Sequence, residues 1–510
     1  MRQGGEMRTE SGRPSRRDRT RAPARPVTRM TGFRPAARVL AVAGLIGASV
    51  VGGGVAAADG AASGHSARLA LAPAARPALP PTDWPAYLNG PSHTSYNASQ
   101  TAITPANATS LTQQWSFTRG APYTASPTVT SSAVYVGGGN GMFYKLSVRT
   151  GRMLDHIYLG RQPAIECPAT GIASTASVAF DPQTNVETVY VAGGNGYLYA
   201  LRASNLSVEW RSVIAIPSTT ENNYYDWSSP TIDNGTIYIG VASSCNVPRV
   251  HGGVLAFNQV TGKRVGAIYS VPAGARNAGG DVWSSVGVAP NGDLYATTGN
   301  GPGPDPELRY AEAILKLSPA LKLLGIFHVP ESQRTVDGDF GGSVIFFGRY
   351  VGACNKNGVF YALRQSTMKL VWWKRIASTF RTNGDAECLA APPDNGTELF
   401  PAGGTATIGG TTYAGSVQER SPVNGVVAWE TGLPGKVLGT PTLDGRGLLA
   451  VGTFAAAPAG GVYLISAATG AIVEELTTGT TFAQSVFADS RLFTATSTGV
   501  SAWGLPAKSG

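Results

Sequence analysis

The chain has 510 residues, of which 43% are hydrophobic and 14% are charged. This composition is far too apolar for a disordered protein, and the length is ample for a large core. Most of the formal net charge of +9 lies in residues 1–38, which hold 11 of the 40 basic residues and three acidic ones, leaving +1 for the rest. We therefore expect no basic surface for binding nucleic acid.

Apolar and small residues follow the basic stretch from Val39 to Ala58. A basic region, a short apolar segment and small residues at its end are typical of a secretory signal peptide, with cleavage expected near Asp59. An uncleaved membrane anchor is the alternative, although the Gly-rich apolar segment is weak for a spanning helix. We predict that residues 1–58 direct export, that the Ala- and Pro-rich residues 59–81 form a linker, and that residues 82–507 form one domain.

The four cysteines are Cys167, Cys245, Cys354 and Cys388. An even number in an exported chain favours two disulfides. Four cysteines allow three pairings, and proximity along the chain favours Cys167–Cys245 and Cys354–Cys388. No Cys-x-x-Cys-His motif occurs, so a covalently attached haem is not expected, and the five histidines lack metal-ligand spacing.

A strand pattern repeats from about residue 111 to the C-terminus. Its clearest marker is the third strand of each unit, usually a glycine followed by apolar and aromatic residues. The eight copies begin at Gly141, Gly196, Gly252, Glu312, Gly358, Gly425, Gly461 and Gly499. They are spaced 36 to 67 residues apart, which suits one four-stranded blade per copy.

Short β-branched and aromatic runs bounded by Gly, Asn and Asp are typical of antiparallel meanders. One small sheet cannot bury both faces, but a ring of sheets can, and it leaves only short edges. We therefore predict an all-β fold, an eight-bladed β-propeller of four-stranded antiparallel blades, with seven blades as the alternative. The last unit, Ser485 to Trp503, is one strand short, and Leu111–Phe117 is expected to supply that strand.

The repeats resemble those of the PQQ-dependent quinoprotein alcohol dehydrogenase-like propellers, which bind pyrroloquinoline quinone (PQQ). The resemblance begins at Asp83-Trp84-Pro85, continues through His93–Asn97 and Ile103–Asn107, and extends over nearly all of residues 83–505. The chain is similar to the polyvinyl-alcohol-dehydrogenase-like subgroup. This implies an exported enzyme that oxidises alcohol or sugar hydroxyls, in small molecules or polymers, by hydride transfer to PQQ. Without a haem motif, it would need a separate electron acceptor.

The resemblance also assigns roles to four residues. Trp283, in Gly-Gly-Asp-Val-Trp, would form the floor on which the quinone stacks, since an indole offers a large flat face. Asn300, 17 residues later, would be a Ca²⁺ ligand. Asp339 would be the catalytic base, with Asp337 as the alternative carrier. Lys356, in Asn-Lys-Asn-Gly, would contact the quinone oxygens.

Each of these residues also has a purely structural reading: a Trp between blades, an Asn in a turn, a pair of loop acids and a Lys in a hairpin turn. Two family features are absent as well. No acid occurs in Cys245–Arg249, where a second Ca²⁺ ligand is expected, and one amide oxygen is insufficient for Ca²⁺. Glu166–Gly171 contains one cysteine where the family caps the quinone with an adjacent pair. The alternative function is a non-catalytic exported propeller that binds a protein, peptide or glycan.

Overall fold

The computed structural model describes residues 78–507, apart from 166, 169, 222, 272–277, 302–308 and 379–387. The predicted signal segment, residues 1–58, and most of the predicted linker lie outside the described residues. No helix in the described part of the chain has the length and apolarity needed to cross a bilayer.

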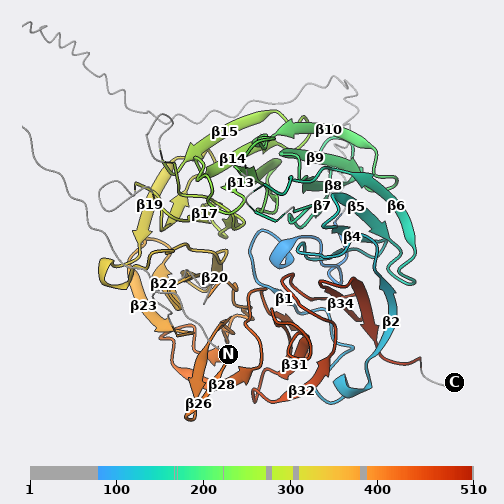
Figure 1. Cartoon of the computed structure of the whole chain (residues 1–510), viewed down its shortest axis with the longest axis vertical. Coiled ribbons are helices and arrows are strands. Elements are labelled where there is room, and N and C mark those ends of the chain that lie inside the picture. The colour runs from blue at the N-terminus through green and yellow to red at the C-terminus, as the bar shows by residue number, and fades with distance from the viewer. Residues whose placement is uncertain are drawn as a thin grey trace, which may run out of the picture. The chain divides into compact units, whose positions relative to one another are not determined.

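The described chain is an eight-bladed β-propeller, as the repeat predicts (Figure 1). The strands of blades 1 and 2 are β3 (Thr128–Val129), β4 (Val134–Gly137), β5 (Met142–Leu146), β6 (Met153–Tyr158), β7 (Ser177–Phe180), β8 (Glu187–Ala192), β9 (Tyr197–Arg202) and β10 (Val208–Val213). Those of blades 3 and 4 are β12 (Thr231–Asp233), β13 (Thr236–Ser243), β14 (Gly253–Asn258), β15 (Arg264–Tyr269), β16 (Gly287–Val288), β17 (Leu294–Thr297), β18 (Ala313–Leu317) and β19 (Leu323–His328).

The strands of blades 5 and 6 are β20 (Ile345–Phe347), β21 (Tyr350–Asn355), β22 (Val359–Arg364), β23 (Leu370–Arg375), β24 (Ala402–Gly403), β27 (Gly415–Arg420) and β28 (Val427–Leu433). Those of blades 7 and 8 are β29 (Thr442–Asp444), β30 (Leu448–Gly452), β31 (Val462–Ser466), β32 (Ile472–Leu476), β33 (Val486–Ala488), β34 (Arg491–Ala495), β35 (Val500–Gly504) and β2 (Thr112–Phe117). Smaller pieces are β1 (Tyr96–Asn97), β11 (Tyr224–Tyr225), β25 (Ala406–Ile408), β26 (Thr411–Tyr413), η1 (Tyr87–Asn89), η2 (Ala108–Ser110) and η3 (Glu331–Gln333).

Blade 8 closes the ring with a strand from the other end of the chain. Strand β2 pairs antiparallel with β35, which confirms the prediction for Leu111–Phe117. Seven of the eight predicted third strands are the third strands of their blades. The copy that begins at Gly425 is wrong, because it leads into the outer strand β28, and β27 is the third strand of blade 6.

The reason for this error is the role of tryptophan in joining blades. An outer-strand Trp packs on a glycine in the last turn of the next blade in four pairs: Trp115–Gly151, Trp210–Gly262, Trp372–Gly425 and Trp429–Gly470. A Cβ on any of these glycines would come within 2.5–2.8 Å of the indole, and each glycine has a φ between +66° and +72°. Glycine is therefore required in both respects. Trp429 marks an outer strand, although its sequence context resembles a third strand.

A ring of hydrogen bonds joins the innermost parts of the blades. The same position in blades 1 to 8 is occupied by Ser126, Thr175, Ser229, Ser285, Ser343, Ala391, Thr440 and Gln484. At six of the eight joints the backbone N–H donates to the hydroxyl of the next blade, at 2.9–3.1 Å. Ala391 has no hydroxyl, so this bond is missing between blades 5 and 6.

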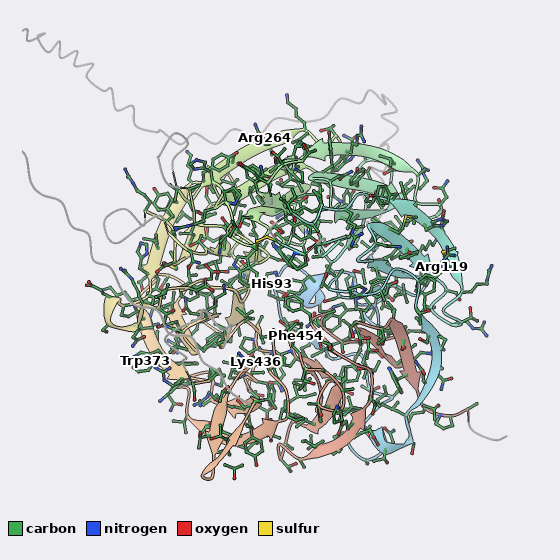
Figure 2. The ribbon with its side chains drawn as sticks, viewed as in Figure 1. His93, Arg119, Arg264, Trp373, Lys436 and Phe454 are labelled. Atoms are coloured by element: carbon green, nitrogen blue, oxygen red, sulfur yellow. A yellow bond between two sulfur atoms is a disulfide. The ribbon has the colours of Figure 1, made fainter. Side chains whose placement is uncertain are left out.

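The segment from Trp84 to Asn97 lies at the centre of the ring, where Figure 1 shows it in blue and Figure 2 labels His93. Tyr87 is half-buried and lines a cavity together with Ser343 and Thr440, which flank Ala391 in the ring. His93 donates through Nδ1 to the carbonyl of Val344 at 2.8 Å. The N-terminal segment thus satisfies a backbone carbonyl that the blades leave open.

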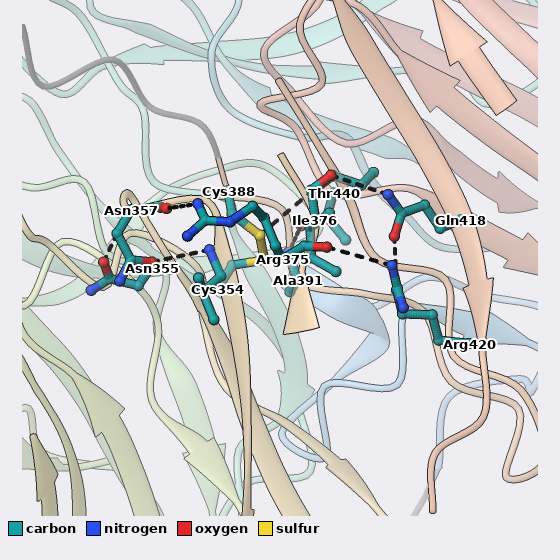
Figure 3. Close-up of a disulfide and its surroundings, with 12 residues drawn as sticks. Cys354, Asn355, Asn357, Arg375, Ile376, Cys388, Ala391, Gln418, Arg420 and Thr440 are labelled. Atoms are coloured by element: carbon teal, nitrogen blue, oxygen red, sulfur yellow. Dashed lines mark hydrogen bonds between the residues drawn. A yellow bond between two sulfur atoms is a disulfide. The ribbon is translucent and has the colours of Figure 1, made fainter. Parts of the chain in front are cut away.

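Both predicted disulfides are confirmed, Cys167–Cys245 and Cys354–Cys388. The second joins β21 of blade 5 to the inner segment of blade 6, and both of its cysteines are fully buried. Figure 3 shows it beside Asn355 and Asn357, which flank Lys356 in the turn after β21.

Candidate functional site

Two cavities lie on the propeller axis, separated by a floor of apolar side chains. The inner cavity, of about 80 Å³, is lined by residues of all eight blades and by Tyr87. The outer cavity, of about 350 Å³, is large enough for a small organic ligand. Five side chains line both cavities and form the floor between them: Trp227, Trp283, Leu389, Leu438 and Phe482.

The floor has a simple origin in the repeat. Its members stand two residues before the hydrogen-bonded ring position of blades 3, 4, 6, 7 and 8. Blade 5 has Gly341 at the same position, and a Cβ there would lie 2.5 Å from Trp283 and 2.2 Å from Leu389. The absence of a side chain at Gly341 therefore lets Trp283 and Leu389 spread over blade 5. The floor is therefore built by side chains from five blades, and Trp283 is one of them.

Charged side chains form one wall of the outer cavity. The Lys356 ammonium lies 2.6 Å from Asp339 Oδ2 and 2.9 Å from Asp337 Oδ2. It also lies 5.5 Å from the ring centroid of Trp283, which is cation–π distance. Asn300 donates from its backbone N–H to Asp339 at 2.5 Å and from its side chain to Asp337 at 2.6 Å. The fold thus brings Trp283, Asn300, Asp339 and Lys356 together.

These residues come from two neighbouring blades, 4 and 5, and backbone contacts fix them. Trp283 precedes β16, Asn300 follows β17, and Asp339 lies in the segment between η3 and β20. The backbone N–H of Lys356 donates to Asp339 O at 2.9 Å. Asn355 reinforces this by donating from its side chain to Gly338 O at 2.7 Å. These two hydrogen bonds therefore hold the turn after β21 against the loop that carries Asp337 and Asp339.

Burial sets the proton affinities in this wall. Asp339 is 3% exposed, and burial raises its pKa, while the Lys356 charge acts in the opposite direction. For Lys356, burial works against the ammonium, but the two carboxylates outweigh it and its pKa is raised. Burial raises the pKa of Asp281 to about 6, opposed by hydrogen bonds from Ser243. The site thus holds a charged ammonium beside carboxyls that bind protons more tightly than usual.

Two residues of the site escaped the sequence analysis. Trp227 lines the outer cavity beside Trp283. Its signal was present, because Asp226-Trp-Ser-Ser repeats the Trp-Ser-Ser that begins at Trp283. Asp281 also lines the cavity, and its Oδ2 accepts from the backbone N–H of Ser243 at 2.6 Å. The sequence places Asp281 in the Trp283 motif but gives no indication that it faces the site.

The region expected to hold a lid is built differently from the family pattern. Cys167 is bonded to Cys245, which lies 78 residues further along the chain and lines the outer cavity. The disulfide therefore ties the loop after β6 to the loop after β13 at the cavity wall. An adjacent cysteine pair is not needed to place a disulfide there.

The residues present fit a planar quinone and a hard cation. The floor offers an apolar face beside an ammonium, and the cavity volume lies in the range of small-ligand sites. The Oδ1 atom of Asn300 is buried and has no hydrogen-bond partner, so it is available to a cation. Among the described residues, no group of three or more His, Cys, Asp or Glu is placed to hold a metal by itself. A cation would therefore also need amide, water or ligand oxygens.

Comparison with known proteins supports the same architecture. The family model PQQ_2, described as outer membrane protein assembly factor BamB, matches residues 89–265. No curated protein matches the chain. The quinohemoprotein alcohol dehydrogenase from Comamonas testosteroni has a TM-score of 0.65 at 17% identity, over 84% of this chain and 81% of that chain.

Two further solved structures are similar. A europium-containing methanol dehydrogenase has a TM-score of 0.64 at 16% identity, over 81% of this chain and 89% of that chain. BamB from Moraxella catarrhalis has a TM-score of 0.51 at 14% identity, over 77% of this chain and 99% of that chain. At these identities the likeness shows a shared PQQ-type propeller fold, and function has to be argued from the site.

Proposed function

We propose that this chain is an exported, PQQ-dependent dehydrogenase of the polyvinyl-alcohol-dehydrogenase-like kind, which oxidises alcohol or sugar hydroxyls. One observation carries the proposal. Lys356 lies over the face of Trp283 at 5.5 Å while it forms a 2.6 Å ion pair with the buried Asp339, and all three line one cavity. A flat surface, a fixed positive charge and a buried carboxylate are the elements that quinone-dependent alcohol oxidation requires.

The residues have distinct tasks in this proposal. PQQ, when bound, supplies an electrophilic carbonyl that accepts a hydride. The indole of Trp283 holds the plane of the ring, and Leu389 and Phe482 extend the apolar surface on which it rests. The Lys356 ammonium stabilises negative charge on oxygen at the edge of the ring. Asp339 takes the proton of the substrate hydroxyl, and burial makes it a stronger base than an exposed carboxylate.

Two other features support the proposal. The two disulfides are consistent with a location outside the cytoplasm. The sequence has no Cys-x-x-Cys-His motif, so electrons would pass to a separate acceptor. The substrate is an alcohol, either small or polymeric, that reaches the outer cavity. Asn300 would hold Ca²⁺ through its free Oδ1.

A second candidate is a non-catalytic propeller that binds a protein, peptide or glycan. The observation that favours it is the match of residues 89–265 to a family model described as an assembly factor. The two candidate functions differ in whether they depend on the ion pair between Lys356 and Asp339, which substitution can test. A binding module has no need to retain the Lys356–Asp339 pair over an apolar floor, whereas the dehydrogenase depends on it.

The test is reconstitution of the purified protein with PQQ and Ca²⁺, followed by an alcohol-dependent dye-reduction assay. We expect bound quinone absorbance, quenching of Trp emission and turnover. Asp339→Asn should abolish turnover while PQQ still binds. Asp293→Asn is the matched control, because Asp293 pairs with Lys316 at 3.0 Å in blade 4 and does not line the cavity. Failure of PQQ to bind would reject the enzyme in favour of the binding module.

A further inference from the structure

Two buried side-chain oxygens in the candidate site have no hydrogen-bond partner. Asp281 is 5% exposed and lines the outer cavity, and its Oδ1 has no partner although Oδ2 accepts from Ser243. Asn300 is half-buried as a whole and does not line the cavity, but its Oδ1 is also buried and without a hydrogen-bond partner. A buried polar atom without a partner is unfavourable, because it has lost its hydrogen bonds to water. Two such side-chain oxygens in one site indicate that a bound group, which these oxygens would coordinate or accept a hydrogen bond from, completes the site.

The backbone holds these two residues side by side. Gly280 donates to Asn300 O at 2.7 Å, and Gly299 donates to Asp281 O at 2.8 Å, so the two segments are paired in both directions. Asp339 joins them, since it accepts from the Asn300 backbone N–H at 2.5 Å. Three oxygen-bearing side chains therefore project from adjoining backbone in blades 4 and 5.

The positive groups nearby are engaged elsewhere. Lys356 binds Asp337 and Asp339. Arg249 is exposed and donates to Gly301 O at 2.5 Å. Neither donates to the free oxygens of Asp281 and Asn300. Asp281, Asp337 and Asp339 place three carboxyl groups beside these two cations, and the Glu312 carboxyl lies against Gly338, so the site accepts a further positive charge.

We propose that Asp281 is the acidic ligand of a hard-cation site, which it forms with Asn300 Oδ1 and the neighbouring Asp339. Hard cations such as Ca²⁺ take six to eight oxygen ligands, and carboxylate, amide and water oxygens together meet that requirement. The acid that is missing from Cys245–Arg249 is thus supplied from the segment before β16, two residues before Trp283. This inference rests on the location of the proposed function, but it concerns cation binding by the protein alone.

The test uses Tb³⁺ and Ca²⁺ on the purified protein without quinone. Tb³⁺ occupies oxygen sites, and its emission is excited by a nearby indole, here Trp283 or Trp227. We expect sensitised emission that Ca²⁺ reverses by competition, and calorimetric binding of about one Ca²⁺ per chain. Asp281→Asn should weaken the affinity for both cations by about tenfold or more, because ligand charge sets the affinity of such sites.

The matched control is Asp444→Asn. Asp444 is 2% exposed and also has an unpartnered oxygen, but it caps a turn in blade 7 and does not line the cavity. Its substitution should leave cation affinity unchanged. The inference is overturned if the wild-type protein binds neither cation, if Asp281→Asn binds as tightly as wild type, or if Asp444→Asn loses as much. Cation binding without any PQQ binding would reject the proposed enzyme and leave this inference standing.

Discussion

Replacing Lys356 by Met should destabilise the protein strongly and in a pH-dependent way. Removing one partner of a buried ion pair costs about 3–5 kcal/mol, because the other charge is left buried and unpaired. The Asp339 side chain is 5% exposed, whereas that of Asp337 is 26% exposed and keeps water. Only Asp339 then remains as a buried carboxylate without a positively charged partner. We therefore expect a loss of about 3 kcal/mol in the free energy of unfolding at pH 8.

The pH dependence follows from the same carboxyl. Burial already raises the pKa of Asp339, and without Lys356 the pKa rises further. Over the range where native Asp339 holds a proton and the unfolded chain does not, stability increases as the pH falls. The penalty of Lys356→Met should therefore shrink between pH 8 and pH 5. The double variant with Asp339→Asn should recover part of the loss at pH 8.

Denaturant unfolding at pH 8 and pH 5, without quinone or added cation, measures these effects. Lys316→Met is the control, because Lys316 is as exposed as Lys356 but pairs with the more accessible Asp293 at 3.0 Å. It should cost less than Lys356→Met, because the Asp293 side chain is 18% exposed and that of Asp339 5%, although Lys316 also donates to Gln365 O at 3.1 Å. The reasoning is refuted if the two lysine variants cost the same, or if the Lys356→Met penalty is equal at both pH values.

The remaining predictions concern the centre of the propeller. Burial lowers the pKa of His93 to about 4, so the stability of the wild type relative to His93→Asn should fall by up to about 3 kcal/mol in denaturant unfolding as the pH drops from about 6.5 to 4. Gly341→Ala should cost about 1–3 kcal/mol by overpacking and alter Trp fluorescence, whereas Gly266→Ala, where the nearest atom is 3.4 Å from the new Cβ, should be near neutral.

Much of the fold could be predicted because its signals are local. Alternating aromatic and β-branched residues, with glycine at each turn, indicate strands and meanders without reference to distant residues. Counting the copies gives eight blades. The supply of β2 to blade 8 follows from one missing strand and one unassigned strand. The single misplaced copy, at Gly425, shows the limit: a third and an outer strand have the same local pattern, and only the contact of Trp429 with Gly470 distinguishes them.

The candidate site shows the same difference between what local sequence motifs indicate and what only the folded structure decides. A family motif on the sequence could identify Trp283, Asn300, Asp339 and Lys356, because each lies in a short recognisable segment. Their ion pairs and hydrogen bonds depend on how blades 4 and 5 meet at the axis, and no local pattern encodes that meeting. The unpartnered Oδ1 of Asp281 is the clearest case. The sequence gives an acid two residues before Trp283, but whether its oxygens are satisfied depends on backbone from a separate strand.

The sequence by itself determined the β-strands and favoured eight blades and the two observed disulfides, because strand periodicity and turn glycines are properties of neighbouring residues and proximity along the chain ranks the cysteine pairings. The tertiary structure alone decided that His93 donates to the carbonyl of Val344, that Gly341 makes room for Trp283, and that Asp281 faces the cavity. These contacts join residues that are tens to hundreds of positions apart. They form only when the ring closes and the inner segments of all eight blades are brought to one axis.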